Sequence, residues 1–349
     1  MQSLTHTGAI DVLGGSRSTL RRTLLICLSL MLALVCVSLA ASLIGSERLP
    51  VGASLCAIFS GGNGACGLSA QQQSILFEIR IPRILLGATV GASLAAAGAG
   101  YQSLLRNPLA EPYLLGISNG AAVGTMIALV FFGTQAWSRP LMAFAGALMS
   151  TFVVYRLARG RTGATPEKLI LAGVIVTTFL SSAIVFITNL MDATRIRAFT
   201  FWLLGDLSGT TGELLIIALF AVVVGTIVLA FNARSLNLMM LGERDAFDLG
   251  VEVGRVRMTV FLAASLLVGA SVASSGSVGY VGLVVPHLVR LSFGSDNRTL
   301  ILAAALAGAL FVVVADTAAR TVIAPRELPV GAITALIGAP LFIYLLRRG

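Results

Sequence analysis

The chain has 349 residues, of which 57% are hydrophobic and 11% charged, whereas an ordinary soluble domain has about 25% charged residues. This composition excludes a soluble enzyme. The formal net charge is +9, but the basic residues separate apolar runs of membrane-spanning length and do not gather on one polar face, which argues against nucleic-acid binding.

The N-terminal region combines basic residues with a long apolar run. Arg17, Arg21 and Arg22 precede an apolar stretch at 23–44, an arrangement that imitates a secretory signal. A signal peptide has an apolar core of about 7 to 15 residues, and this run is longer. We therefore predict residues 1–22 as a cytoplasmic N-terminal tail and the apolar run as an uncleaved first membrane helix.

Nine further apolar runs, separated by charged or Gly/Pro-rich breaks, predict membrane helices. They lie at 81–105, 113–133, 139–158, 168–190, 213–231, 256–275, 280–293, 299–319 and 331–347. The run at 280–293 is short, so it either begins earlier, around the preceding glycines, or does not cross the membrane fully. A spanning helix with its connection takes roughly 30 to 35 residues. Residues 23–349 therefore form one polytopic, all-α membrane domain of about ten helices.

The distribution of basic residues predicts the orientation. With a cytoplasmic N-terminus, 16 of the 24 lysines and arginines fall in inside segments and eight in outside segments. Cytoplasmic loops carry the excess of basic residues in membrane proteins. Both termini are therefore expected in the cytoplasm.

The four cysteines divide into two pairs. Cys27 and Cys36 lie within the first predicted helix, where they are expected to be small apolar fillers. Cys56 and Cys66 fall in the predicted outer loop around a Gly-Gly-Asn-Gly turn. Their spacing permits a disulfide in an oxidising compartment, and both a bridge and two free thiols remain open.

Two arginines flank the start of the second predicted helix. Arg80 and Arg83 lie on either side of Pro82, and residues three apart on a helix share a face. They can present guanidinium groups to carboxylates of a partner or extend to lipid headgroups. The pair alone favours neither interpretation.

Glycines recur at intervals of four residues on two predicted helices, at Gly87 and Gly91 and at Gly116, Gly120 and Gly124. Such stripes allow helix backbones to approach closely in lipid. Tight packing inside one subunit is favoured over a contact between subunits.

Only one lysine, Lys168, is present, and Leu169 follows it. A phosphate-binding loop of the form GxxxxGK[ST] requires a lysine followed by serine or threonine. The sequence contains no such loop, so nucleotide chemistry must come from another chain.

Two segments on the predicted cytoplasmic side are unusual. In the stretch 106–124, two prolines and Asn107 form a rigid turn before a glycine-striped helix. The stretch 235–251 is too charged to span but long enough for two short helices separated near Gly242. Such an element can dock a soluble subunit or lie on lipid. Docking is favoured, because on a lipid surface the acidic residues of this stretch would be repelled by anionic headgroups.

The C-terminal part contains a histidine and one membrane-embedded acid. Asp316 and Arg320 are four residues apart and are expected to pair near the outer end of their helix. His287 is expected to be a structural hydrogen-bonding group, because the other histidine, His6, lies in the N-terminal tail and cannot complete a metal site. We expect no metal and no cofactor.

Six motifs, in order and spacing, resemble the FecCD family of permeases, which serve ABC importers of iron-siderophores, haem and cobalamin. They are RIPR at 80–83, RNPLAEPYLLGISNGAAVG at 106–124, LGERDAFDLGV at 241–251, GYVGLVVPHLVR at 279–290, ADTAAR at 315–320 and ELPVGAITALIGAP at 327–340. The similarity extends from about residue 76 to the end, and its motifs are most similar to those of cobalamin permeases.

The resemblance implies a type II ABC importer permease fold in a bacterial inner membrane. It also implies a homodimer, two cytoplasmic ATP-binding subunits and a periplasmic substrate-binding protein. Arginines that match Arg80, Arg83 and Arg320 lie at the periplasmic rim in the family and meet acidic residues of the binding protein. The predicted topology places all three outside, which favours docking over headgroup contact.

The family also implies roles for cytoplasmic residues. The stretch at about 235–253 resembles the coupling helices that contact the ATPase, and the implied coupling residues are Leu241, Gly242, Glu243, Asp245, Ala246, Leu249 and Gly250. Asn107 and Leu109 match one side of the cytoplasmic gate. Pro166 and Glu167 occupy the other side, where this chain departs from the pair of small hydroxyl residues of cobalamin permeases.

The function expected from the resemblance is import of a large metal chelate by ATP-driven alternating access, with no enzymatic activity in this chain. The main alternative is an ion-coupled secondary transporter of a small solute, a class that usually needs an ionisable group deep in the membrane. Asp316 is the acid placed well inside a predicted span, and its expected pairing with Arg320 argues against that alternative. The motifs do not identify the chelate.

Overall fold

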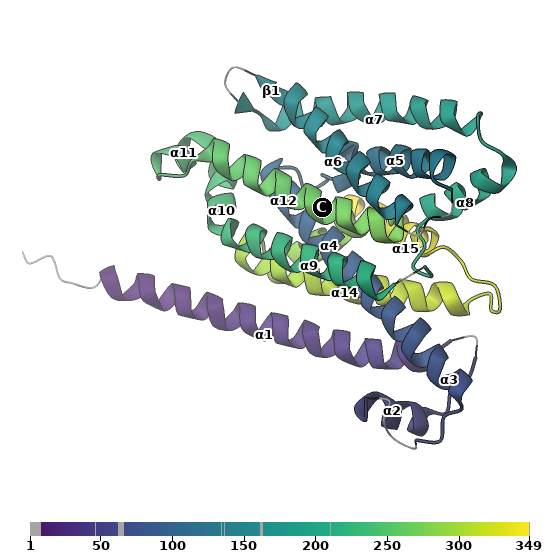
Figure 1. The fold of residues 1–349 in the computed structure, drawn as a ribbon. Coiled ribbons are helices and arrows are strands. Elements are labelled where there is room, and N and C mark those ends of the chain that lie inside the picture. Colours follow the sequence, from purple (N-terminus) through teal and green to yellow (C-terminus); the bar gives the residue numbers. More distant parts are fainter. Residues whose placement is uncertain are drawn as a thin grey trace, which may run out of the picture.

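Ten apolar helices make up most of the computed structural model, which describes residues 8–45, 47–61, 66–133, 135, 137–160, 163–209 and 211–348 (Figure 1). They are α1 (Gly8–Leu43), α4 (Ile81–Leu104), α5 (Ile117–Phe131), α6 (Ser138–Ala158), α7 (Pro166–Thr188), α9 (Gly212–Phe231), α12 (Val253–Ser275), α13 (Val281–Phe293), α14 (Asn297–Thr321) and α15 (Val330–Arg348). Each corresponds to one predicted run, and α1 already begins within the segment predicted as an N-terminal tail. His6 lies outside the described residues.

Shorter elements connect these helices. They are α2 (Val51–Phe59), α3 (Ala70–Ser74), the π-helix η1 (Ile75–Arg80), the 3-10 helix η2 (Pro112–Leu115), the hairpin β1 (Arg159–Gly160) and β2 (Gly163–Ala164), α8 (Ala193–Leu203), α10 (Ala233–Leu241) and α11 (Glu243–Asp248). The all-α prediction is confirmed, because the described strands comprise only this small hairpin.

Seven helices of the described chain are long and apolar enough to cross a membrane, and α5, α13 and α15 are shorter apolar helices. The short run at 280–293 does not begin earlier. Gly276 and Tyr280 have φ angles of 69° and 66°, which interrupt the helix between α12 and α13. The 13 residues of α13 span about 20 Å, less than the roughly 30 Å of hydrocarbon.

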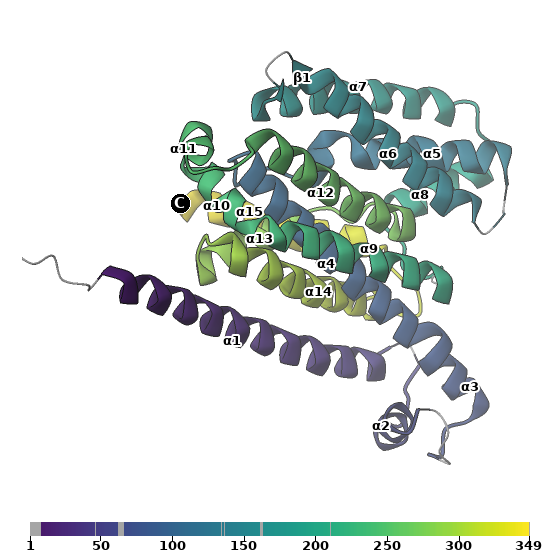
Figure 2. The same ribbon diagram turned by 60° about the vertical axis from the view of Figure 1, so that its left-hand side comes forward.

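The bundle has two ends, which carry different short elements (Figures 1 and 2). The hairpin end, on the left in both views, carries β1, α10, α11 and the beginning of α1. The disulfide end, on the right, carries α2 and α3.

Local sequence signals fix several helix starts. Ser69 and Gln72 form a capping box at α3, and the side chains of Asp192, Thr211 and Asp296 accept backbone N–H groups at α8, α9 and α14. These contacts satisfy backbone donors that a helix leaves free in its first turn.

Helix α4 lies in the middle of the bundle and contacts α9, α12, α13 and α14. A Cβ atom at Gly91 would overlap the carbonyl group of Gly308 on α14, and one at Gly98 would overlap that of Gly282 on α13. Glycine permits this approach because it has no side chain. The stripe on α4 therefore serves packing within the chain.

The second glycine stripe brings α5 against α6. A Cβ atom at Gly120 would overlap the backbone of Gly146, and one at Gly124 would overlap that of Met142. Both predicted stripes thus pack helices of the same chain, as favoured from the sequence.

Helix α1 lies against α14 and leaves its other side open. Thr23 Oγ1 is 2.5 Å from Thr299 Oγ1, and Arg22 Nη2 donates to the carbonyl of Phe293 at 3.1 Å. Leu24, Leu28 and Leu32 are exposed. A lipid bilayer accounts for such a surface, because exposing a whole apolar helix face to water would be unfavourable.

The disulfide end contains a bond between Cys56 and Cys66, one of the two arrangements left open by the sequence. Cys27 and Cys36 are free. We expect iodoacetamide to alkylate two cysteines in the unfolded, unreduced protein and all four after reduction, as measured by intact mass. Four alkylated cysteines without reductant would contradict the bond.

Candidate functional site

A buried ion network lies at the disulfide end of α4 and α14. Asp316 Oδ1 accepts a hydrogen bond from Arg83 Nε at 3.0 Å, and Asp316 Oδ2 is 3.1 Å from Arg320 Nε. Arg83 Nη1 also donates to Glu327 Oε2 at 2.6 Å. Asp316 is 1% exposed. The predicted pair of Asp316 with Arg320 is confirmed, and it belongs to a larger network.

Arg80 ties the end of α1 to the π-helix η1. Its Nη1 donates to the carbonyl oxygens of Ser42 and Leu43 at 2.9 and 3.2 Å, and its Nη2 donates to that of Glu47 at 2.5 Å. The carbonyls of Ser42 and Leu43 lie at the end of α1 and have no partner in a following helical turn. Arg80, Arg83 and Arg320 are therefore all at the disulfide end, yet each is buried and bonded within the chain.

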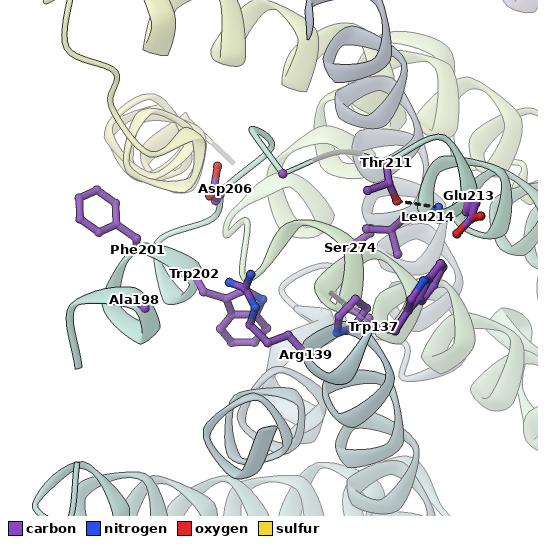
Figure 3. A pocket seen from close by; sticks show the side chains of 13 residues that line it. Trp137, Arg139, Ala198, Phe201, Trp202, Asp206, Thr211, Glu213, Leu214 and Ser274 are labelled. Atoms are coloured by element: carbon purple, nitrogen blue, oxygen red, sulfur yellow. Dashed lines mark hydrogen bonds between the residues drawn. The ribbon is translucent and has the colours of Figure 1, made fainter. Parts of the chain in front are cut away.

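A pocket of about 220 Å³ opens between the starts of α6 and α9, helix α8 and the end of α12 (Figure 3), and it shares Phe201 and Asp206 with a smaller pocket lined by Arg83 and Glu327. Arg139, Asp206 and Glu213 supply its charges, and Trp137 and Trp202 supply aromatic surface. Small-molecule sites usually have about 300 to 1,000 Å³. This pocket is therefore too small for a large chelate.

Side chains from the stretch 106–124 form hydrogen bonds with the irregular segment between α12 and α13. The Tyr113 hydroxyl donates to the carbonyl of Val278 and accepts its N–H, both at 3.0 Å. Ser118 donates to Ser277 Oγ at 3.2 Å. Irregular backbone at membrane depth needs such partners. Sequence reasoning marked this stretch as a rigid turn but did not identify the contact, which joins residues about 165 positions apart.

The predicted gate residues lie in two segments at the hairpin end. Asn107 Oδ1 accepts the N–H of Leu109 at 2.9 Å, which holds the turn rigid, and Leu109 is exposed. Pro166 opens α7 at its first position, where its missing N–H is not needed. Glu167 is exposed beside it.

The predicted coupling segment forms α10 and α11, two short helices separated at Gly242 as expected. Gly250 follows α11 with φ 84°, a left-handed conformation that glycine adopts readily. Leu241, Asp245 and Leu249 are exposed, and so is Phe247, which the sequence did not single out, whereas Ala246 is buried.

The remaining predicted coupling residue, Glu243, joins a charge cluster that the sequence did not predict. Its Oε1 lies 3.3 Å from Arg106 Nη2 and 2.5 Å from Arg257 Nη2. Arg257 also donates to the carbonyl of Ala164. The four residues come from four separate elements or connections of the chain, so no local pattern could identify the cluster.

No group of three or more His, Cys, Asp or Glu side chains that could hold a metal occurs in the part of the chain that the structure describes. His287 stacks edge-on against Phe342, with ring centroids 6.4 Å apart. The expected structural hydrogen bond is not found, because His287 Nδ1 is buried without a hydrogen-bond partner among the described residues, and the ring is held by packing alone.

Comparison with known proteins agrees with the geometry. The model of the FecCD transport family matches residues 25–348. Cobalamin import system permease protein BtuC of Halobacterium salinarum is 45% identical over 80% of this chain and 75% of its own. Hemin transport system permease protein HmuU of Yersinia pestis is 40% identical over 78% of this chain and 83% of its own.

A solved structure supports the fold. It is an inward-facing conformation of a metal-chelate type ABC transporter, with 30% identity and a TM-score of 0.80 over 94% of this chain and 100% of that one. The arrangement of helices is therefore that of an ABC importer permease.

Proposed function

The chain belongs to the FecCD transport family and is the permease subunit of an ABC importer, and from this we propose that it carries a large metal chelate across a bacterial inner membrane. Iron-siderophores, haem and cobalamin are the candidate cargoes, since relatives are named for cobalamin and hemin. The chain is not an enzyme, because ATP hydrolysis belongs to a separate subunit. The family resemblance drawn from six motifs is confirmed.

One observation carries this proposal. The family match covers residues 25–348, while the sequence lacks the lysine motif of a phosphate-binding loop. The energy source is therefore an ATP-binding partner. The ion-coupled alternative loses support because Asp316 is paired with two arginines.

The assembly has this permease as a homodimer with two ATP-binding subunits and a periplasmic binding protein. The hairpin end faces the cytoplasm, with both termini. The disulfide supports a periplasmic position for the other end, because such bonds persist in oxidising compartments.

The binding protein docks at the disulfide end through Arg80, Arg83 and Arg320, whose buried side chains exchange contacts within the chain for carboxylates of the binding protein. The side chain of Glu327 is 48% exposed and forms an ion pair with Arg83, so a carboxylate of the binding protein can replace it. Such pairs at a rim orient a partner more than they add affinity.

The ATP-binding subunits contact α11 and its flanks through Leu241, Gly242, Asp245, Leu249 and Gly250, with Ala246 packing the helix on the bundle. Exposed apolar side chains beside charged ones support this contact. The gate has Asn107 and Leu109 on one side and Pro166 and Glu167 on the other. Closure of the ATP-binding subunits moves α11 and switches the side to which the pathway opens.

Reconstitution tests this function. We expect liposomes that contain the permease and its ATP-binding subunits to accumulate cyanocobalamin, haemin or ferrichrome only when ATP and the binding protein are both present. A complex with an ATPase subunit that binds but does not hydrolyse ATP is the control. Accumulation by the permease alone, driven by an ion gradient, would contradict the proposal.

A further inference from the structure

Glu243 differs from the other acidic residues of α11 in the direction of its contacts. Its side chain is 37% exposed and approaches two arginines of the bundle. Asp245 and Asp248, on the same helix, are exposed and have no ion pair among the described residues. Helix α11 therefore presents an apolar and acidic surface outward and holds one carboxylate against the rest of the chain.

One of the two arginines adjoins the first gate segment in sequence, and the other binds the backbone beside the second gate segment. Arg106 directly precedes Asn107, in a left-handed conformation with φ 50°. Arg257 lies on α12, and its guanidinium donates to the carbonyl of Ala164, two residues before Pro166. One carboxylate oxygen thus connects α11 with both gate segments.

We propose that Glu243 is a positioning residue that transmits movement of α11 to both sides of the gate. This inference rests on the proposed function, in which α11 contacts the ATP-binding subunits. It assigns Glu243 to an internal connection, whereas the family resemblance places it only within the coupling segment.

The two contacts of Glu243 differ in strength. The side chain of Arg257 is 6% exposed, and a buried guanidinium is costly to leave without a counter-charge. The side chains of Arg106 and Glu243 are each more than a third exposed, so their pair is weak. When α11 moves, Arg257 and the Ala164 segment follow it closely, and the weaker contact with Arg106 carries a smaller part of the movement to the segment of Asn107.

Cysteine labelling at the gate tests this connection. The reporter is Leu109→Cys in a permease carrying Cys27→Ser and Cys36→Ser, assembled with its ATP-binding subunits in liposomes. The rate of modification by a polyethylene-glycol maleimide is measured with and without a non-hydrolysable ATP analogue. Co-purification of the ATP-binding subunits is measured in parallel.

Glu252→Gln is the matched control, because Glu252 lies beyond Gly250, the last residue assigned to the contact with the ATP-binding subunits. Glu252 Oε2 is 2.9 Å from Arg255 Nη1, but both side chains are more than 60% exposed, and the pair joins neighbouring residues only. The Glu252→Gln substitution removes the same charge as Glu243→Gln from the same end of the bundle, and Glu252 contacts neither gate segment.

We expect the nucleotide-dependent change in labelling rate to fall on the order of tenfold in Glu243→Gln, because the buried guanidinium loses its counter-charge. Glu252→Gln retains the parental change, and the ATP-binding subunits remain bound in both. Adding Arg106→Gln to Glu243→Gln causes no further loss, since both act through one contact.

Three results would overturn the connection. Glu243→Gln with the parental response would remove its role, and Glu243→Gln that no longer binds the ATP-binding subunits would make it a docking residue. A parental complex whose labelling ignores nucleotide would refute the proposed ATP-driven function, and the connection with it.

Discussion

Replacing Asp316 by asparagine is expected to cause one of the largest losses of stability available from a single change in this chain. The carboxylate is 1% exposed and is the shared counter-charge of Arg83 and Arg320. Removing one partner of a buried ion pair costs about 3 to 5 kcal/mol, and here two guanidinium groups lose their partner. The fraction of protein that stays monodisperse after heating, followed by size-exclusion chromatography in detergent, measures the loss.

Glu327→Gln is the control for this network. Its side chain is 48% exposed, so its pair with Arg83 is worth at most about 1 kcal/mol. Combining Asp316→Asn with Arg320→Gln should recover part of the stability, because one uncompensated charge is removed. An Asp316→Asn protein as heat-resistant as the parent would show that the network does not stabilise the fold.

The second large effect is expected where α4 crosses α14. In Gly91→Ala the new methyl group would overlap the backbone carbonyl of Gly308 and lie 2.9 Å from Val312 Cγ2. Overpacking a core costs about 1 to 3 kcal/mol, and we expect the upper end because backbone atoms cannot rotate away. The yield of folded protein and its thermal stability in detergent measure this effect.

Gly254→Ala is the matched control for Gly91→Ala. Gly254 also lies in a membrane helix, but a Cβ atom there would meet nothing within 4 Å. Alanine favours a helix over glycine by up to about 1 kcal/mol, so this variant should be as stable as the parent or slightly more stable. If the two variants were equally stable, close packing at Gly91 would not matter.

The helices could be predicted because each is a long apolar run with a charged or Gly/Pro-rich break at its ends. Helix α8 was missed, since its 11 residues include Arg195 and Arg197 and interrupt the apolar pattern. The limits of α13 stayed open because the break depends on the backbone at Gly276 and Tyr280. That conformation is supported by Tyr113, a distant residue.

The candidate site shows the same division between local and distant information. Asp316 and Arg320 could be paired from their spacing on one helix. Arg83 joins them from 233 residues away, and Arg257 reaches Ala164 from 93 residues away. Helix periodicity carries no information about such contacts, so the burial of Arg80, Arg83 and Arg320 could not be predicted from their motifs.

The shortness of α13 has a consequence for how the chain enters the bilayer during synthesis. Thirteen residues are fewer than the roughly 17 to 25 needed for a helix to insert by itself, so this segment must partition together with α12 or α14. Its polar approach, residues 276–280, receives its hydrogen bonds from Tyr113 and Ser118. Because the ribosome makes these two residues first, their side chains are already present in the membrane when the short segment emerges.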